Sequence, residues 1–125
     1  MISGTVTTNR EAILCLTIRD IGRQEHPRDA IVDTGFDGWL TLPPDVIREL
    51  GLEWQRFGRA LLADGSESVF DIYEVVLIWD GQPRAVSIYE MDAVPLVGMS
   101  LMYGYEFMLP ILDGATFTLR SLTST

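Results

Sequence analysis

The amino-acid sequence predicts a single domain, residues 1–125, that is mostly β and carries one or two short helices. Its length of 125 residues is enough for one hydrophobic core, and an apolar content of 47% excludes a disordered chain. Apolar and polar side chains alternate in several segments, which is the period of a half-buried strand. Asp-Gly pairs at 64–65, 80–81 and 113–114 separate apolar runs and favour tight hairpin turns, because both residue types tolerate positive φ.

The alternation is strictest near the two ends of the chain. In segments 14–19 and 116–120 every second residue is apolar, so the apolar side chains lie on one face. This pattern predicts two half-buried strands. The polar segment Asp20 to Asp29 contains a glycine and a proline. We expect it to form a surface loop or a wide hairpin turn.

Two hairpins follow from the later Asp-Gly pairs. The run Val69 to Trp79 is predicted to turn at the second pair and to return through Arg84 to Tyr89. The segment Tyr105 to Leu112 is expected to pair across the third Asp-Gly with 116–120. Pro110 removes one backbone donor from that segment, which favours an edge strand or a bulge.

Two short helices interrupt the strands. Pro43-Pro44-Asp45 opens the first, 46–50 supplies its apolar face, and Gly51 ends it. The second is predicted over about Met99 to Tyr103, between two glycines.

Charge and composition exclude several classes of partner. The net charge of −9 argues against a nucleic-acid surface and against docking on anionic lipid. The longest apolar runs fall short of the roughly 18 residues of a membrane helix, and the first ten residues lack the pattern of a signal peptide. We therefore expect a cytoplasmic protein that binds neither nucleic acid nor membrane.

The chain has one cysteine and one histidine, too few for a structural zinc site. Cys15 lies in an apolar run and is predicted to be a small buried side chain. His26 falls in the polar segment beside Pro27 and is predicted to be exposed. The sequence thus predicts no metal and no cofactor.

The tripeptide Asp33-Thr34-Gly35 is the strongest chemical feature of the chain. It ends the apolar run Ala30 to Val32, so a carboxylate lies where a buried strand breaks into a turn. Such a charge is costly to desolvate unless it is paired. The chain holds one such tripeptide, so a paired-carboxylate mechanism would take the second acid from a second copy of the chain.

The tripeptide has two interpretations. Two carboxylates about 3 Å apart share one proton, and together they can activate water for attack on a peptide bond. Gly35 would then allow the sharp turn, and the Thr34 hydroxyl would hold it. Alternatively Asp-Thr-Gly is an ordinary turn of a monomeric β domain.

The surrounding pattern resembles the retropepsin-like (retroviral-type) aspartic proteases, particularly their small bacterial members. Ile31-Val32-Asp33-Thr34-Gly35 matches the catalytic loop, and Leu96 to Met102 matches the apolar-apolar-Gly segment with its helix. The resemblance extends from Glu11 to Met102. It implies a closed-barrel-like monomer and a homodimer with one active site at the subunit interface.

The resemblance also assigns residues. It makes Asp33 the catalytic carboxylate, gives Thr34 an inter-subunit hydroxyl contact and lets Gly35 line the substrate backbone. Asp37 matches a position that hydrogen-bonds substrate backbone, and Phe36 replaces the usual small residue, where a ring would narrow the cleft or form a subsite wall.

The flap and two other segments depart from the retroviral pattern. Leu61 to Ser66 matches the flap, so the resemblance implies that Ala63, Asp64 and Gly65 contact substrate. The segment has one glycine where retroviral enzymes have several. The alternative interpretation is that the segment is only a hairpin turn. Met99 replaces an arginine that pairs with the acid at position 37. The chain also continues past Met102 with a hairpin, which would alter the dimer.

The sequence predicts an aspartic endopeptidase acting on peptide or protein substrates as a homodimer. The alternative is a catalytically weak or inactive protease-like module that binds or scaffolds peptides by adding them to a strand edge. The Phe36, Met99 and flap departures favour this alternative, whereas the intact Asp33-Thr34-Gly35 favours the enzyme.

Overall fold

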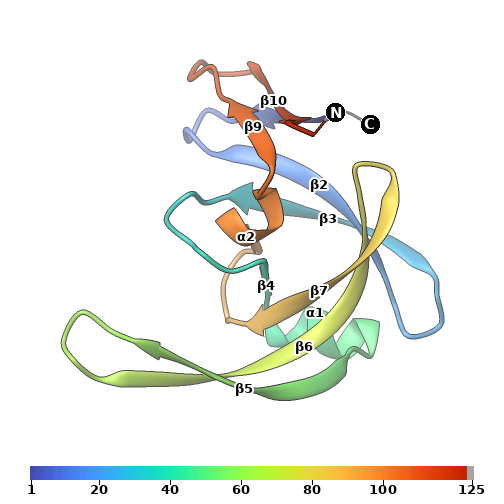
Figure 1. Ribbon diagram of the computed structural model, residues 1–125, viewed down its shortest axis with the longest axis vertical. Helices are drawn as coiled ribbons and strands as arrows, with labels where there is room; N and C mark the ends of the chain where they lie inside the picture. The colour runs from blue at the N-terminus through green and yellow to red at the C-terminus, as the bar shows by residue number, and fades with distance from the viewer. Residues whose placement is uncertain (124–125) are drawn as a thin grey trace.

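A computed structural model describes residues 1–123 of the chain (Figure 1). The described part contains ten strands and two short helices, in the order β1 (Ile2–Val6), β2 (Ala12–Arg19), β3 (Glu25–Val32), β4 (Leu40–Leu42), α1 (Pro44–Leu50), β5 (Glu53–Leu61), β6 (Glu67–Trp79), β7 (Gln82–Glu90), β8 (Leu96–Val97), α2 (Met99–Met102), β9 (Tyr105–Met108) and β10 (Thr116–Ser121). The mostly β prediction is therefore confirmed.

All ten strands belong to one sheet, in the order β5-β6-β7-β4-β8-β3-β2-β1-β10-β9. β6 also pairs with β2, so the long sheet folds back on itself and encloses the core. The outer half of the β5–β6 hairpin extends away from this body (Figure 1). The β9–β10 hairpin and the N-terminal strand lie together at the opposite end (Figure 1).

The core lies inside the curved sheet and takes the alternate residues of its strands. In β2, Leu14, Leu16 and Ile18 are buried, as the alternation predicts. Cys15 points to the other face and is exposed, so its predicted burial is wrong. The strand period decides its environment, and the general preference of cysteine for the interior does not.

The two hairpins predicted from the later Asp-Gly pairs are present as β6–β7 and β9–β10. Asp80 and Gly81 have φ of 52° and 81°, which is the left-handed pair that a two-residue hairpin turn needs, and β6 returns there into β7. β9 pairs with β10 as predicted, but it ends at Met108, before Pro110. The proline lacks the donor that a longer ladder would require.

The polar segment 20–29 is only partly a loop. β3 begins at Glu25 and pairs with β2 from Arg19 to Ile13, so the second half of the segment is strand. His26 is half-buried and its Nε2 lies 2.8 Å from Oδ2 of Asp20, which corrects the prediction of an exposed loop histidine. This hydrogen bond is the main cause that lowers the pKa of Asp20.

Both predicted helices are present. α1 starts at Pro44 and ends at Leu50, and Gly51 caps it in the left-handed conformation with a φ of 64°. α2 is a single turn after Gly98. Neither helix of the described residues is long and apolar enough to cross a membrane.

Candidate active site

Three strands, β3, β4 and β8, position the Asp33 loop. β8 lies between β3 and β4, parallel to the first and antiparallel to the second. The chain leaves β3 at Val32, passes through residues 33–39 and re-enters the sheet as β4. The segment 33–39, here called the Asp33 loop, therefore connects the two strands that flank β8 and passes across the end of β8.

The backbone of the Asp33 loop is fixed along its length. The amide of Asp33 donates to the carbonyl of Val97 at 2.9 Å. The amide of Met99 donates to the carbonyl of Phe36 at 2.8 Å, and that of Ser100 to the carbonyl of Gly38 at 3.0 Å. β8 and the start of α2 thus hold both ends and the middle of the loop, although the loop itself has no regular structure.

The Asp33 carboxylate lies at the first position of this loop. Its Oδ1 accepts a hydrogen bond of 2.9 Å from the amide of Gly35, and its own carbonyl accepts from the amide of Phe36 at 3.2 Å. Asp33 is half-buried, whereas Thr34 and Gly35 are exposed. The carboxylate is therefore oriented by the turn and keeps contact with solvent.

Two glycines allow the loop to lie directly on β8. A Cβ atom at Gly98 would be 2.2 Å from the carbonyl oxygen of Gly38, which is a backbone atom, so the loop itself would have to shift. A Cβ at Gly38 would be 2.5 Å from the Phe36 ring. Gly98 belongs to the matched sequence pattern, but the role of Gly38 depends on a contact that sequence reasoning missed.

Asp37 and Thr34 line one side of a cavity of about 720 Å³ beside α2. Ser100 Oγ donates to the backbone carbonyl of Asp37 at 2.5 Å, and the Asp37 carboxylate is exposed. Met99 also lines the cavity and is 50% exposed. The sequence departure at position 99 thus leaves an apolar side chain beside Asp37.

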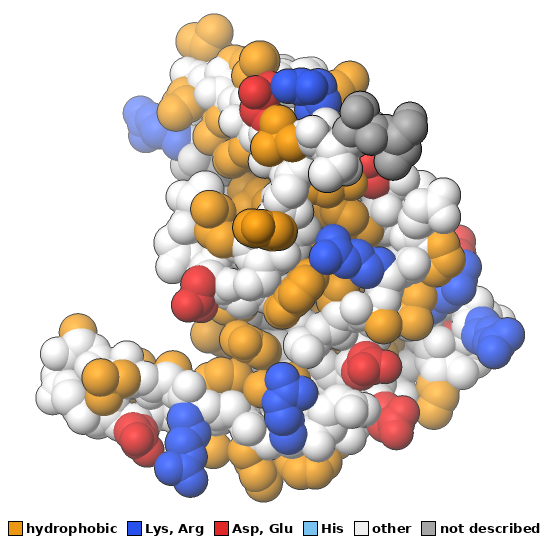
Figure 2. Space-filling model, in the orientation of Figure 1, with side chains coloured by type: hydrophobic (Ala, Val, Ile, Leu, Met, Phe, Trp, Pro, Cys, Tyr) orange, Lys and Arg blue, Asp and Glu red, His pale blue; other side chains and the backbone are white. Residues whose placement is uncertain are grey.

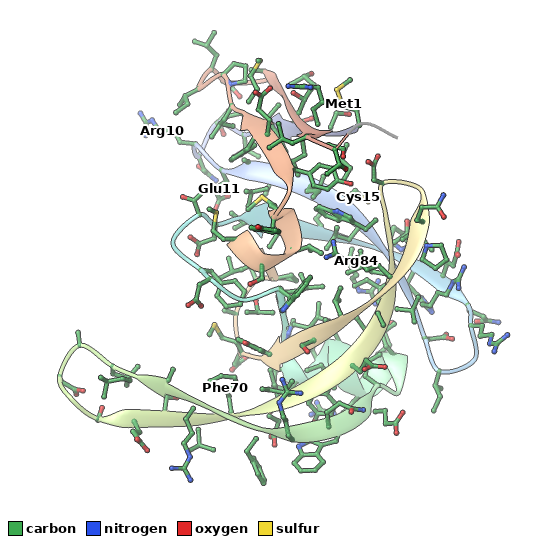
Figure 3. All side chains as sticks on the ribbon, viewed as in Figure 1. Met1, Arg10, Glu11, Cys15, Phe70 and Arg84 are labelled. Atoms are coloured by element: carbon green, nitrogen blue, oxygen red, sulfur yellow. The ribbon has the colours of Figure 1, made fainter. Side chains whose placement is uncertain are left out.

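Arg84 of β7 also lines this cavity, a position that sequence reasoning missed. Its guanidinium lies over the Trp39 ring, 4.9 Å from the ring centroid, and Nη1 is 3.5 Å from the carbonyl of Leu101. Arg84 lies in the centre of the molecule beside α2 (Figure 3). The contact depends on the register of β7 in the sheet, which no local pattern encodes.

The predicted flap residues lie at the tip of the β5–β6 hairpin. Ala63, Asp64 and Gly65 are all exposed, and Gly65 has a φ of 87°. Asp64 Oδ1 accepts from the amide of Ser66 at 2.9 Å and from its hydroxyl, and these bonds lower the pKa of Asp64. The tip does not line the cavity of Thr34 and Asp37, so these two groups of predicted residues remain apart in the single chain.

Among residues 1–123, no group of three or more His, Cys, Asp or Glu side chains is placed to hold a metal ion. The candidate site instead consists of one oriented carboxylate, an exposed Thr-Gly turn and a neighbouring apolar cavity. In a single chain, the Asp33 carboxylate can act as an acid or a base, but the second acid that a paired-carboxylate mechanism requires is missing.

Comparison with solved structures finds a protein of similar fold. No protein-family model matches the chain, and no curated protein is similar to it in sequence. A crystal structure of a retropepsin-like aspartic protease from Rickettsia conorii superimposes with a TM-score of 0.61, over 94% of this chain and 87% of that chain, at 15% identity. The likeness at this identity shows that the two chains share a fold.

Proposed function

We propose that the protein is an aspartic endopeptidase whose active site forms when two copies bring their Asp33 side chains together. The observation that carries the proposal is the position of Asp33: a solvent-accessible carboxylate oriented by the Gly35 amide, in a loop held by β8 and α2. The fold shared with a retropepsin-like aspartic protease supports it.

The proposed reaction needs one proton between the two carboxylates. Two acids about 3 Å apart cannot both ionise easily, so one stays protonated. The ionised Asp33 takes a proton from a water molecule held between them, and the protonated one donates to the carbonyl oxygen of the peptide bond. Water then adds to the carbonyl carbon, and collapse of the tetrahedral species with protonation of the nitrogen breaks the C–N bond.

The neighbouring residues take supporting roles in this proposal. Thr34 is exposed in the single chain and would contact the second copy. Gly35 and Asp37 would bind the substrate backbone, and Phe36 would border the substrate side chains. Ala63, Asp64 and Gly65 would cover the substrate from the hairpin, which must move to admit it.

Asp33→Asn tests the proposal directly. An amide cannot hold or release the shared proton, so cleavage of a peptide library should fall on the order of 10³-fold. Asp92→Asn is the matched control, because Asp92 is an exposed acid outside the loop. Thermal unfolding of both variants reports whether the fold is retained.

Two results would contradict the proposal. One is undiminished cleavage by a folded Asp33→Asn protein. The other is a strict monomer at high concentration in sedimentation, which would leave Asp33 without a partner acid and favour an ordinary turn in a monomeric domain.

A second candidate is a peptide-binding module without turnover. β5 is an edge strand of the sheet, and eight of its nine residues are exposed, so it offers free backbone groups to an added strand. This function predicts capture of peptides without cleavage by the natural chain, and equal capture by Asp33→Asn.

A further inference from the structure

The cavity of about 720 Å³ beside α2 has the size and the lining of a small-molecule site. Such sites commonly have volumes of about 300–1,000 Å³, mostly apolar walls and a few polar groups. On the face shown in Figure 2, hydrophobic side chains gather around α2. Large apolar and aromatic side chains make up much of the cavity wall, namely Trp39, Met99, Met102, Tyr103, Tyr105 and Phe107.

Arg84 adds a half-buried positive charge to this wall. In the described part of the chain two other arginines are half-buried, and each has an acidic partner. Arg19 lies 3.3 Å from Glu25. Arg28 lies 2.8 Å from Glu49. No carboxylate of the described residues lies within 4.0 Å of the Arg84 guanidinium. Since a charge withdrawn from water is costly unless it is paired, Arg84 would be stabilised by an anion that enters the cavity.

The Arg84 guanidinium is held in position and keeps donors for a ligand. It lies over the Trp39 ring, 4.9 Å from the ring centroid, and beside α2 (Figure 3). Its Nη1 is 3.5 Å from the carbonyl oxygen of Leu101. A guanidinium presents several N–H donors in one plane, and a carboxylate can accept from a pair of them in parallel. The arrangement therefore favours a planar carboxylate.

The acids around the cavity limit the charge that a ligand can carry. Asp37 lines the cavity together with Arg84. Asp80 accepts a hydrogen bond of 2.9 Å from the Tyr105 hydroxyl, but its other oxygen is paired with the amino group of Met1 at 2.8 Å. A doubly charged anion such as a phosphate monoester would be repelled by Asp37 more strongly than a singly charged one. The cavity thus favours an anion with one negative charge.

We propose that the cavity beside α2 binds a monocarboxylate whose remainder is aromatic or aliphatic, with the carboxylate on Arg84 and the apolar remainder against the cavity wall. The C-terminal residue of a peptide and a free small carboxylic acid share this chemistry. Asp33 is not among the residues that line the cavity, and binding at this site does not require hydrolysis. The inference therefore goes beyond the proposed function.

A matched pair of probes tests the role of charge in the natural chain by titration calorimetry. N-acetyl-phenylalanine carries the carboxylate, and N-acetyl-phenylalaninamide has the same ring and the same peptide group without the charge. The acid should bind on the order of tenfold more tightly than the amide, because the amide lacks the charge-assisted hydrogen bonds to Arg84. Equal affinities, or no binding of the acid at millimolar concentration, would overturn the proposal.

Phenylpropionate distinguishes the two sources of the carboxylate. It has the ring and the charge but no peptide group. Equal affinity for phenylpropionate and N-acetyl-phenylalanine supports a site for free carboxylic acids. Tighter binding of N-acetyl-phenylalanine supports a site for the end of a peptide.

Arg84→Gln removes the charge and keeps most of the side-chain length. Its affinity for N-acetyl-phenylalanine should fall on the order of tenfold, to that of the amide, while its affinity for the amide stays unchanged. Arg84→Lys keeps the charge but loses the parallel donors, so it should give an intermediate affinity. Thermal unfolding reports whether each variant is folded, and the comparison of acid with amide in the natural chain needs no variant.

Arg19→Gln is the matched control, because Arg19 is also half-buried but lies outside the cavity. It should bind the acid as the natural chain does. If Arg19→Gln lost as much affinity for the acid as Arg84→Gln, the assignment of the carboxylate to Arg84 would be wrong.

Met99→Ser tests where the apolar part of the ligand lies. Met99 lines the cavity and is 50% exposed, whereas Met91 is 45% exposed and lies outside it, so Met91→Ser is the control. Met99→Ser should weaken the binding of acid and amide alike, by about fivefold, because apolar contact is lost. Affinities equal to those of Met91→Ser would show that the ring of the ligand binds elsewhere and would contradict the proposal.

A second copy of the chain is the alternative occupant, because Thr34 lines the cavity and would contact that copy in the proposed enzyme. Sedimentation with and without N-acetyl-phenylalanine gives the oligomeric state during binding. A dimer that binds no acid would show that the second copy covers the cavity, which would refute this inference and leave hydrolysis standing. Acid binding by a chain that cleaves no peptide would refute hydrolysis and support this site.

Discussion

The Asp33 loop and the β5–β6 hairpin carry the two parts of the candidate site, but different interactions hold them. The loop has no regular structure, yet its backbone is bonded to β8 and α2 and packs on them through Gly38 and Gly98. The outer hairpin is regular strand, yet its residues pair only with each other until β7 joins β6 at Ile72. An irregular loop is therefore bonded to the body of the protein, whereas a regular hairpin extends from it.

This difference matches two needs of the proposed reaction, which are an acid held in position and a segment that opens to admit substrate. Segments with many buried contacts open only with global unfolding, whereas exposed segments with few contacts open at low free energy. In the proposed reaction the carboxylate must be held accurately, and the loop that carries it is hydrogen-bonded to β8 and α2 although several of its side chains are exposed. The hairpin tip is exposed and pairs only within the hairpin, which fits the role of admitting substrate that we propose for it.

The largest expected effect comes from breaking the contact between the loop and β8. In Gly98→Ala the new Cβ would lie 2.2 Å from the carbonyl oxygen of Gly38, so the loop must move away and lose its bonds to β8 and α2. We expect a loss of about 3 kcal/mol in the free energy of unfolding. Chemical denaturation measures it.

Gly22→Ala is the control for that substitution. A Cβ at Gly22 meets only the Asp20 side chain, at 3.3 Å. Its effect should be within about 0.5 kcal/mol. If the two alanine variants were equally stable, the loop would be far less tightly held than its contacts indicate.

A smaller effect is expected from one buried hydrogen bond in the same region. Thr41 of β4 is fully buried, and its hydroxyl oxygen accepts from the amide of Leu96 at 2.9 Å. Thr41→Val keeps the shape but leaves that amide without an acceptor, which should cost about 1–3 kcal/mol. Thr5→Val, at an exposed position of β1, should cost little. Equal melting temperatures for the two valine variants would show that the bond does not hold β8 in place.

The parts of the fold that sequence reasoning predicted are those set by local chemistry. The Asp80-Gly81 turn follows from residue types that tolerate positive φ, and α1 follows from its prolines and Gly51. β8 has only two residues, and its place between β3 and β4 depends on long-range pairing. Local patterns cannot specify such a strand; only the family resemblance indicated it.

The same limit applies to the candidate site. Asp33, Thr34 and Gly35 are adjacent in the sequence, so their shared turn was predictable. Arg84 and Tyr89 reach the site through the register of β7, and no local pattern marks them. His26 illustrates the opposite case: its segment is polar, but pairing with β2 makes it strand.

The base of the β5–β6 hairpin differs from the Asp33 loop in a further way, because two acidic side chains, Asp71 and Glu90, lie there. Asp71 of β6 accepts from Nε1 of Trp54 on β5 at 2.9 Å. Burial raises the pKa of Glu90 on β7, and the charge of Asp71 and a hydrogen bond to it raise the pKa further, against a lowering contribution from Arg48 of α1. Asp71 therefore contacts Trp54 of β5 through a hydrogen bond and raises the pKa of Glu90 on β7 at the base of the hairpin.

Glu90→Gln should give the smallest effect, visible only as a change with pH. Because the folded protein raises the pKa of Glu90 above its ordinary value of 4.5, its protonation stabilises the fold fully below that pH, and this contribution is lost as pH rises through the raised pKa. Glutamine cannot titrate, so the difference in melting temperature between the natural chain and the variant should change across this window. Asp20 and Asp80 have lowered pKa values, so their contribution to stability depends on pH in the opposite direction. Both acids are present in the natural chain and in the variant, so their contributions cancel in the difference between the two melting temperatures. Glu74→Gln, at an exposed position of β6, should give a flat difference. A flat difference for Glu90→Gln as well would mean that the titration of Glu90 does not contribute to the stability of the hairpin base.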